Sequence, residues 1–141
     1  MNYDGSCGFL IKQIHDSIEK TVNNQLREMG LTLAQIQLVL TLLDLNEGAG
    51  SFKELEKRLG VSQATTAGLI NRLEQKGFAV TEIDDSDRRI KNARITNAGR
   101  TVCACAREKM EALEARLLCG LGESRAVGFR LCLQAVHDNL S

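Results

Sequence analysis

Apolar residues recur at every third or fourth position along most of this 141-residue chain, and no proline interrupts them. This spacing matches one face of an α-helix, which has 3.6 residues per turn. Because a proline inside a helix costs about 3 kcal/mol, a chain without proline can form long uninterrupted helices. We therefore expect a mainly α-helical protein, and the length fits a single domain.

Two helices are predicted in the first third of the chain. Residues 7–29 have one apolar stripe, and Gly30 follows at the position where a left-handed residue favourably ends a helix. Residues 32–45 are apolar on most sides, which predicts a helix in the centre of the fold. Thr32 and Gln35 have the spacing of a capping box, so this second helix is expected to begin there.

Two further helices are predicted at the other end. Thr96 can cap a helix over residues 97–119, and a break at 120–122 precedes a last helix. The apolar residues of that last helix are Phe129, Leu133, Val136 and Leu140. Neither these helices nor the first has an obvious apolar partner in so small a chain. Pairing the ends of two copies would bury these faces, so we expect a homodimer with residues 1–30 and 97–141 as dimerisation helices.

The stretch 52–73 has the residue pattern of a helix-turn-helix. Gly60 permits the turn between two short helices, and Ser62 caps the second. The residues expected on the inner side of that second helix are Ala67, Ile70 and Leu73. The preceding residues 46–50 are rich in glycine and predict a loop. The pattern alone also fits an antiparallel corner in a generic α-helical domain.

Hydrogen-bonding side chains occupy the first turn of the second helix, namely Ser62, Gln63, Thr65 and Thr66. Such groups can reach base edges in DNA, and a helix N-terminus favours a phosphate. The charge distribution agrees, although the net charge of the whole chain is zero. Residues 51–100 hold ten Lys or Arg and seven Asp or Glu, a net charge of +3, whereas residues 1–50 have a net charge of −3. The middle of the chain is therefore the part suited to phosphate contacts.

A β-hairpin is predicted directly after the helix-turn-helix. Residues 78–83 and 92–95 are short strand candidates, and the charged segment 84–89 lies between them. In isolation, a charged segment of this kind would be interpreted as a solvated turn.

Four segments carry a resemblance to a known family. They are residues 60–66 (GVSQATT), 71–78 (NRLEQKGF), 87–89 (DRR) and 95–99 (ITNAG). With these segments in this order, the sequence resembles the MarR family over nearly its whole length. The resemblance implies a mainly α fold with a small β-hairpin wing. It implies a winged helix-turn-helix at residues 31–96, flanked by the dimerisation helices within a single domain.

The resemblance also implies roles for individual residues. Arg89 is expected to enter the minor groove of DNA, Asp87 to support the wing tip, and Arg88 and Lys91 to touch phosphates. The negative potential of a narrow minor groove attracts arginine, which agrees with this assignment. The full set of expected DNA-binding residues is Ser62, Gln63, Thr65, Thr66, Asn71, Arg72, Arg88, Arg89 and Lys91. The implied partner is double-stranded DNA with a pseudo-palindromic operator, and the implied function is a transcription regulator, a repressor released by a ligand.

The chain departs from the family pattern at two positions. Glu56 stands where the family usually has a small residue, often alanine, so it must point past the second helix or open the angle between the helices. Ile95 replaces the usual leucine conservatively.

The regulatory signal is open at this point. Family members respond to small effectors, usually aromatic or phenolic acids, and His15, Leu38 and Leu42 are candidates for lining an effector pocket. The alternative is redox sensing through Cys7, because a helix N-terminus makes a thiol more reactive and hydroperoxide-sensing members carry a cysteine in a similar place. Those sensors also use tyrosines, and the only tyrosine here is Tyr3.

Several classes of function find no support in the sequence. The five cysteines form no CxxC pair, and no histidine spacing suits a zinc site, so neither a metal nor another cofactor is expected. No nucleophile–base pair or phosphate loop suggests an enzyme. Without a bilayer-spanning stretch or a signal-peptide pattern, we expect a cytoplasmic protein with no membrane partner. A winged helix used for protein–protein contacts stays open as a further alternative.

Overall fold

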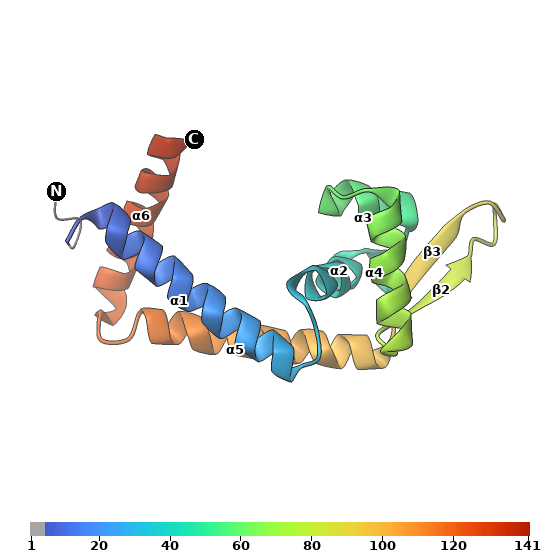
Figure 1. Ribbon diagram of the computed structural model, residues 1–141, viewed down its shortest axis with the longest axis horizontal. Helices are drawn as coiled ribbons and strands as arrows, with labels where there is room; N and C mark the ends of the chain where they lie inside the picture. The colour runs from blue at the N-terminus through green and yellow to red at the C-terminus, as the bar shows by residue number, and fades with distance from the viewer. Residues whose placement is uncertain (1–4) are drawn as a thin grey trace. The chain divides into compact units, whose positions relative to one another are not determined.

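The computed structural model describes residues 5–141, which form six α-helices, one short 3-10 helix and a three-stranded antiparallel sheet (Figure 1). This is the mainly α fold with a small β wing that the sequence predicts. Contacts within the chain separate it into two compact units that meet at residues 105 and 106. We call the described residues 5–105 the winged unit and residues 106–141 the C-terminal unit.

The winged unit begins with the two predicted helices, α1 (Cys7–Glu28) and α2 (Leu33–Asp44). Gly30 has a left-handed φ of 73°, so α1 ends where the sequence indicates. The capping box of α2 is confirmed. The Gln35 N–H donates to the Thr32 hydroxyl at 3.2 Å, and the Thr32 N–H donates to the Gln35 side chain at 3.2 Å.

The segment after α2 corrects the prediction of a loop at residues 46–50. A 3-10 helix, η1 (Asn46–Gly48), leads into the short strand β1 (Ala49–Ser51), which pairs with the last strand of the sheet. Three residues are too few to display the alternation that identifies a strand, and glycine usually indicates a turn. The strand exists because its partner lies beside it, which is tertiary information.

The helix-turn-helix consists of α3 (Phe52–Leu59) and α4 (Gln63–Gln75). Gly60 has a φ of 67° between them, and the Ser62 hydroxyl accepts the Thr65 N–H at 3.1 Å to cap α4. The prediction for the inner side of α4 is correct for Ile70 and Leu73 and wrong for Ala67. Ala67 is exposed, while Thr66 is buried in its place.

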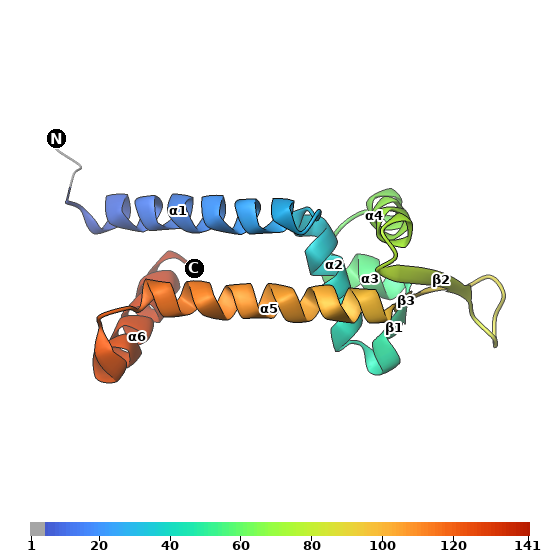
Figure 2. The same ribbon diagram turned by 90° about the horizontal axis from the view of Figure 1, so that it is seen from below.

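The hairpin consists of β2 (Ala79–Ile83) and β3 (Lys91–Ile95), and the strand order in the sheet is β1-β3-β2. In this register Ala79 pairs with Ile95, and Ile83 pairs with Lys91 next to the connecting loop. The hairpin, which we call the wing, extends away from α2, α3 and α4 (Figure 2).

One hydrophobic core holds the winged unit together. Its fully buried side chains come from α2, α3, α4 and the start of α5: Leu38, Val39, Leu42, Leu55, Thr66, Ile70, Leu73 and Cys103. Helix α2 contributes the most, in agreement with its predicted central place. This core fixes α4 and the wing on one scaffold.

The remaining helices are α5 (Asn97–Leu117) and α6 (Gly122–Leu140). The Thr96 hydroxyl accepts the Gly99 N–H at 3.1 Å, as expected for a cap at the start of α5. No residue of α6 is buried. Among residues 5–141, no single helix combines the length and apolar composition needed to cross a membrane, and only the bent pair of α1 and α2 reaches both together.

Candidate nucleic-acid interface

The first turns of α4 present the polar side chains that the sequence singles out. Ser62, Gln63 and Thr65 are exposed, and the Ser62 hydroxyl donates to the Thr65 hydroxyl at 2.9 Å. Further along the helix Asn71 and Arg72 are also exposed. Five of the six α4 candidates, counting the cap, therefore lie on the surface of the winged unit.

Thr66 is the exception and corrects the expected set. Its side chain has 0% exposure, and its hydroxyl donates to the Ser62 carbonyl oxygen at 3.0 Å. Four residues before Ile70, it lies on the helix face that enters the core, since residues i and i+4 share a face. A buried hydroxyl whose proton is already bonded cannot contact a base edge, so we leave Thr66 out of the candidate interface.

The tip of the wing is organised by Asp84. Its carboxylate accepts the Ser86 N–H at 2.8 Å, the Ser86 hydroxyl at 2.6 Å and the Asn92 side-chain amide at 3.2 Å. These bonds, the Ser86 hydroxyl foremost, lower the pKa of Asp84 to about 2. The charged segment thus forms an ordered turn with its own internal hydrogen bonds.

Asp87 holds Arg89 at the end of the wing. The Arg89 side chain donates to both carboxylate oxygens of Asp87 at 3.1 Å, and the Arg89 N–H donates to one of them at 3.0 Å. The Arg89 side chain bonded in this way lowers the pKa of Asp87. Arg89 still has 90% of its side chain exposed, so its guanidinium is oriented yet accessible.

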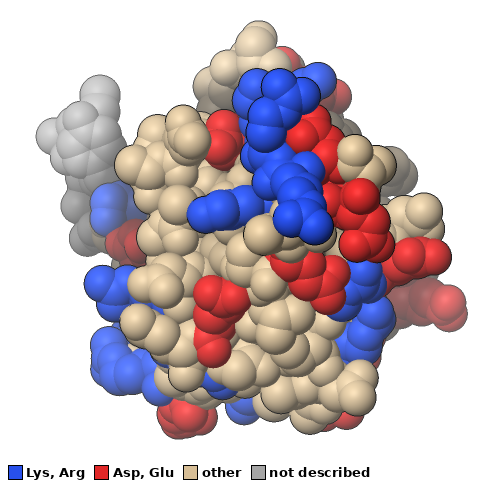
Figure 3. All heavy atoms as spheres, turned by 90° about the vertical axis from the view of Figure 1, so that its right-hand side faces the viewer, with Lys and Arg blue, Asp and Glu red and all other residues tan. Residues whose placement is uncertain are grey.

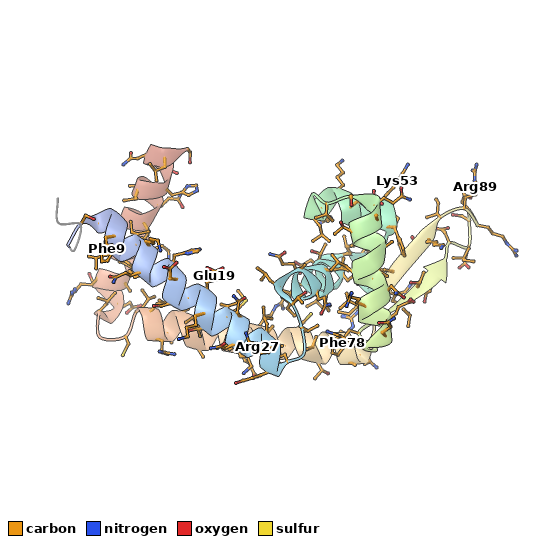
Figure 4. All side chains as sticks on the ribbon, in the orientation of Figure 1. Phe9, Glu19, Arg27, Lys53, Phe78 and Arg89 are labelled. Atoms are coloured by element: carbon orange, nitrogen blue, oxygen red, sulfur yellow. The ribbon has the colours of Figure 1, made fainter. Side chains whose placement is uncertain are left out.

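A groove of about 500 Å³ separates the wing from α3 and the beginning of α4. Its charged and amide-bearing lining residues are Lys53, Glu56, Gln63, Arg89 and Lys91. Lys53 and Arg89 extend from α3 and the wing tip toward the same side (Figure 4). The structure thus brings together three of the predicted residues, Arg89 and Lys91 from the wing and Gln63 from α4. Arg88 is exposed in the same turn but is not among the residues that line this groove.

Two lining residues were not predicted as part of the site. Lys53 received no role from the sequence, and Glu56 was noted only for its effect on the helix angle. Both lie on α3, three residues apart, and therefore share a helix face. A cation near the start of the first helix was the available indication, but only the fold places it opposite the wing.

Acidic and basic side chains are mixed at the wing-bearing end of the molecule. Figure 3 shows Lys and Arg side chains gathered there with Asp and Glu side chains beside them. Within the sheet, Arg94 donates to the Glu82 carboxylate at 3.2 Å and to the Glu47 carbonyl oxygen at 3.0 Å. The basic excess of the middle segment is thus partly neutralised within the fold.

Lys76 anchors the far end of α4. Its ammonium group donates to the Gly30 carbonyl oxygen and, at 2.8 Å, to the Gln35 side-chain oxygen. That same Gln35 oxygen takes part in the capping box of α2. The end of the helix that carries the candidate interface is therefore bonded to the junction between α1 and α2.

The effector candidates do not come together. Leu38 and Leu42 have no exposed surface and pack in the core, so neither faces a ligand at the surface of the winged unit. His15 lies on α1 with 70% of its side chain exposed, 3.5 Å from Asp16 and 3.9 Å from Glu19. These three residues are close enough to share a cation, but Asp16 already accepts a hydrogen bond from Lys12 at 2.7 Å.

No disulfide joins any of the five cysteines within the described residues. Cys7 is exposed at the first position of α1, as the sequence suggests. Cys103 is buried in the core of the winged unit.

A model of the MarR family matches residues 29–90 of this chain. The matched range contains α2, the helix-turn-helix and most of the wing, including every candidate DNA-contacting residue except Lys91. No curated protein matches the sequence significantly.

Solved structures share the fold over almost the whole chain. MepR, a transcription regulator of a multidrug efflux pump of Staphylococcus aureus, has a TM-score of 0.84 at 18% identity, with 96% of this chain and 99% of that chain covered. A MepR–DNA complex has a TM-score of 0.82 at 19% identity and covers 95% and 99%. BpsR of Bordetella bronchiseptica, whose DNA binding is regulated by 6-hydroxynicotinic acid, has a TM-score of 0.67 at 23% identity and covers 98% and 97%.

Identities this low establish the fold alone, and the family model adds a match over residues 29–90. The matched range 29–90 includes both features of the candidate interface, the helix that Ser62 caps and the wing tip where Asp87 holds Arg89. Residues 29–90 therefore match the MarR family, and the chain shares the winged helix-turn-helix fold of the solved structures over almost its whole length.

Proposed function

We propose that this protein is a homodimeric transcription regulator that binds a pseudo-palindromic operator in double-stranded DNA. The first turns of α4 enter the major groove, where Gln63, Thr65 and Asn71 reach base edges. Arg89 enters the adjacent minor groove from the wing. The observation that carries the proposal is the oriented and exposed Arg89, held by Asp87 across a groove from the exposed face of α4.

Phosphate contacts supply most of the affinity in this proposal. Arg88, Lys91 and Arg72 are exposed cations near the proposed groove contacts, and each neutralised phosphate releases counterions. The similarity to MepR, which has been crystallised with DNA, supports this placement of the fold on a duplex. A regulator that contacts DNA in this way binds more weakly as salt is raised.

The homodimer rests on apolar residues that the chain itself leaves exposed. Helix α1 exposes Leu10, Ile11 and Ile14 by 43% to 50%. Helix α6 exposes Val127, Phe129, Leu131, Leu133, Val136 and Leu140. Exposed apolar patches of this kind mark association surfaces. A two-fold dimer would present two copies of α4 to half-sites about 34–36 Å apart.

The regulatory part of the proposal is a repressor that a small molecule releases from DNA. The regulation of BpsR by 6-hydroxynicotinic acid supports an aromatic or phenolic acid as the class of effector. His15 is the candidate that stays accessible for such an acid. Cys7 offers a second possibility, oxidation, because its thiol is exposed at the start of a long helix.

The decisive experiment compares wild type with Arg89→Ala. Both are titrated into a fluorescent DNA pool that contains the region upstream of the protein's own gene, over a salt series. We expect wild-type binding to weaken linearly in the logarithm of salt and the variant to bind at least tenfold more weakly, about the loss for one good groove contact. Arg116→Ala is the matched control, because it removes an exposed arginine of the C-terminal unit.

Absence of wild-type binding at low salt would contradict the proposal. It would favour a winged helix that contacts proteins. Equal losses in Arg89→Ala and Arg116→Ala would contradict the role of the wing, because they would indicate an effect of overall charge.

A further inference from the structure

The groove between the wing and α3 contains a carboxylate among its cations. Lys53 and Glu56 line it from α3, Gln63 lines it from α4, and Arg89 and Lys91 line it from the wing. Glu56 is half-buried there. The three cations of this groove attract an anionic ligand, and the carboxylate repels it.

The carboxylate of Glu56 is not neutralised by a neighbour. Within residues 5–141 it forms no ion pair, whereas Glu54, two residues earlier on the same helix, lies 3.6 Å from Arg58. Two residues apart on a helix, these side chains point to different faces. Glu56 faces the groove, and Glu54 is absent from its lining.

We propose that Glu56 limits the affinity of this protein for DNA. In the proposed function, on which this inference rests, the sugar–phosphate backbone passes between the wing and α4, where Lys53 and Lys91 attract it. The Glu56 carboxylate lies in the same groove and repels the phosphates. It therefore offsets part of the attraction without contacting a base.

The size of the effect follows from the distance and the solvent. Two unit charges several ångströms apart at a wet surface interact weakly, and salt screens them over about 10 Å at 0.1 M. Removal of one such charge should tighten DNA binding about three- to fivefold at low salt. Because phosphates are the same in every sequence, the gain should be equal for all duplexes, so Glu56 suppresses binding to DNA in general.

The test uses the full-length protein and a fluorescein-labelled, mixed-sequence duplex of about 30 base pairs, from roughly 50 to 200 mM salt. Glu56→Gln and Glu56→Ala both remove the charge. The glutamine keeps the size of the side chain, and the alanine is a strong helix former. Glu56→Asp keeps the charge. Glu54→Gln is the matched control, since it removes a charge from the same helix but from outside the groove. Thermal unfolding of each variant checks that it is folded.

We expect Glu56→Gln and Glu56→Ala to bind about three- to fivefold tighter than wild type near 50 mM salt, with the gain shrinking toward 200 mM. Glu56→Asp and Glu54→Gln should stay within about twofold of wild type. The inference is overturned if the two neutral variants bind no tighter, or if Glu54→Gln gains as much as Glu56→Gln.

Arg89→Ala, measured in the same series, separates this inference from the proposed function. If Arg89→Ala weakens binding and Glu56→Gln has no effect, only the role of Glu56 fails. If wild type does not bind the duplex at all, the proposed function fails and this inference fails with it.

Discussion

The core of the winged unit and the C-terminal unit treat their apolar residues in opposite ways. The winged unit buries Leu38, Leu42, Leu55 and Leu73 completely in a core of its own. In the C-terminal unit only Ala106 is buried, and α6 exposes large side chains such as Leu131 and Leu140. Because burial of a leucine stabilises a protein by about 1.5–3 kcal/mol, the winged unit is stabilised by its own core. The C-terminal unit leaves its large apolar side chains at the surface, where the proposed dimer would cover them.

This difference explains how the two parts divide the proposed function. A rigid core keeps α4 and the wing in fixed register, as the reading of DNA requires. In the proposed dimer, the exposed apolar helices would bring two such readers together. Each part can therefore be disturbed without the other, and the predictions below test that separation.

The largest expected effect on stability is in the winged core. Leu42→Ala should lower the free energy of unfolding by about 2–5 kcal/mol, because it leaves a cavity among fully buried side chains. Leu131→Ala, at a side chain with 66% exposure, is the matched control and should change it by less than about 0.5 kcal/mol at concentrations where the protein is monomeric. Chemical denaturation measures both. Similar losses in the two variants would contradict the contrast between the units.

The next effect concerns association. The double variant Phe129→Ser and Leu133→Ser should weaken dimerisation about tenfold or more, because both side chains are exposed apolar residues on α6. Arg130→Ser, on the same helix, should leave dimerisation nearly unchanged. Sedimentation equilibrium measures the dissociation constant, and circular dichroism checks the helical content. An unchanged dimer in the double variant would show that α6 is not the association surface.

A smaller effect is expected at Lys76, which bonds the end of α4 to the junction of α1 and α2. Lys76→Met keeps the aliphatic stem and removes the hydrogen bonds to the Gly30 carbonyl oxygen and the Gln35 side chain. We expect a loss of about 1 kcal/mol in the free energy of unfolding. Lys20→Met on α1 is the control. If both variants were as stable as wild type, the anchor would contribute nothing measurable.

The smallest effect is confined to the wing tip. The folded pKa of Asp84 is about 2, below its ordinary value of 3.8, so its contribution to wing order is fully present above about pH 4. That contribution is lost as the pH falls through about 2. Ser86→Ala removes the main cause and should raise the pKa of Asp84 toward 3.8, which an NMR titration of the carboxyl carbon measures. An unchanged pKa in this variant would contradict the assigned hydrogen bond.

Much of this fold was predictable because its determinants are local. Periodicity, the Thr32 capping box and the glycine turn at Gly60 act within a few residues of each other. Strand β1 was missed because three residues acquire a strand conformation only through pairing with β3. Thr66 was misplaced because the phase of α4 depends on which face meets the core, and a hydroxyl can satisfy itself on the carbonyl four residues earlier.

The candidate site was predictable only in its parts. The wing residues and the first turn of α4 follow from chain order and from the resemblance. The groove does not, because Lys53, Glu56 and Lys91 come from elements that only the tertiary fold brings together. Leu38 and Leu42 were expected near a ligand because the sequence does not show which side chains the core buries. In the structure both are fully buried in the core.

The most direct test of the account is a footprint on DNA selected by the wild-type protein, repeated with Arg89→Ala. Hydroxyl-radical cleavage should reveal two protected half-sites whose centres lie about 34–36 Å apart, and dimethyl sulfate should reveal protection in the major groove. Arg89→Ala should lose protection of the minor groove beside each half-site and keep that of the major groove. No footprint, or an identical footprint for the variant, would contradict DNA recognition by α4 and the wing.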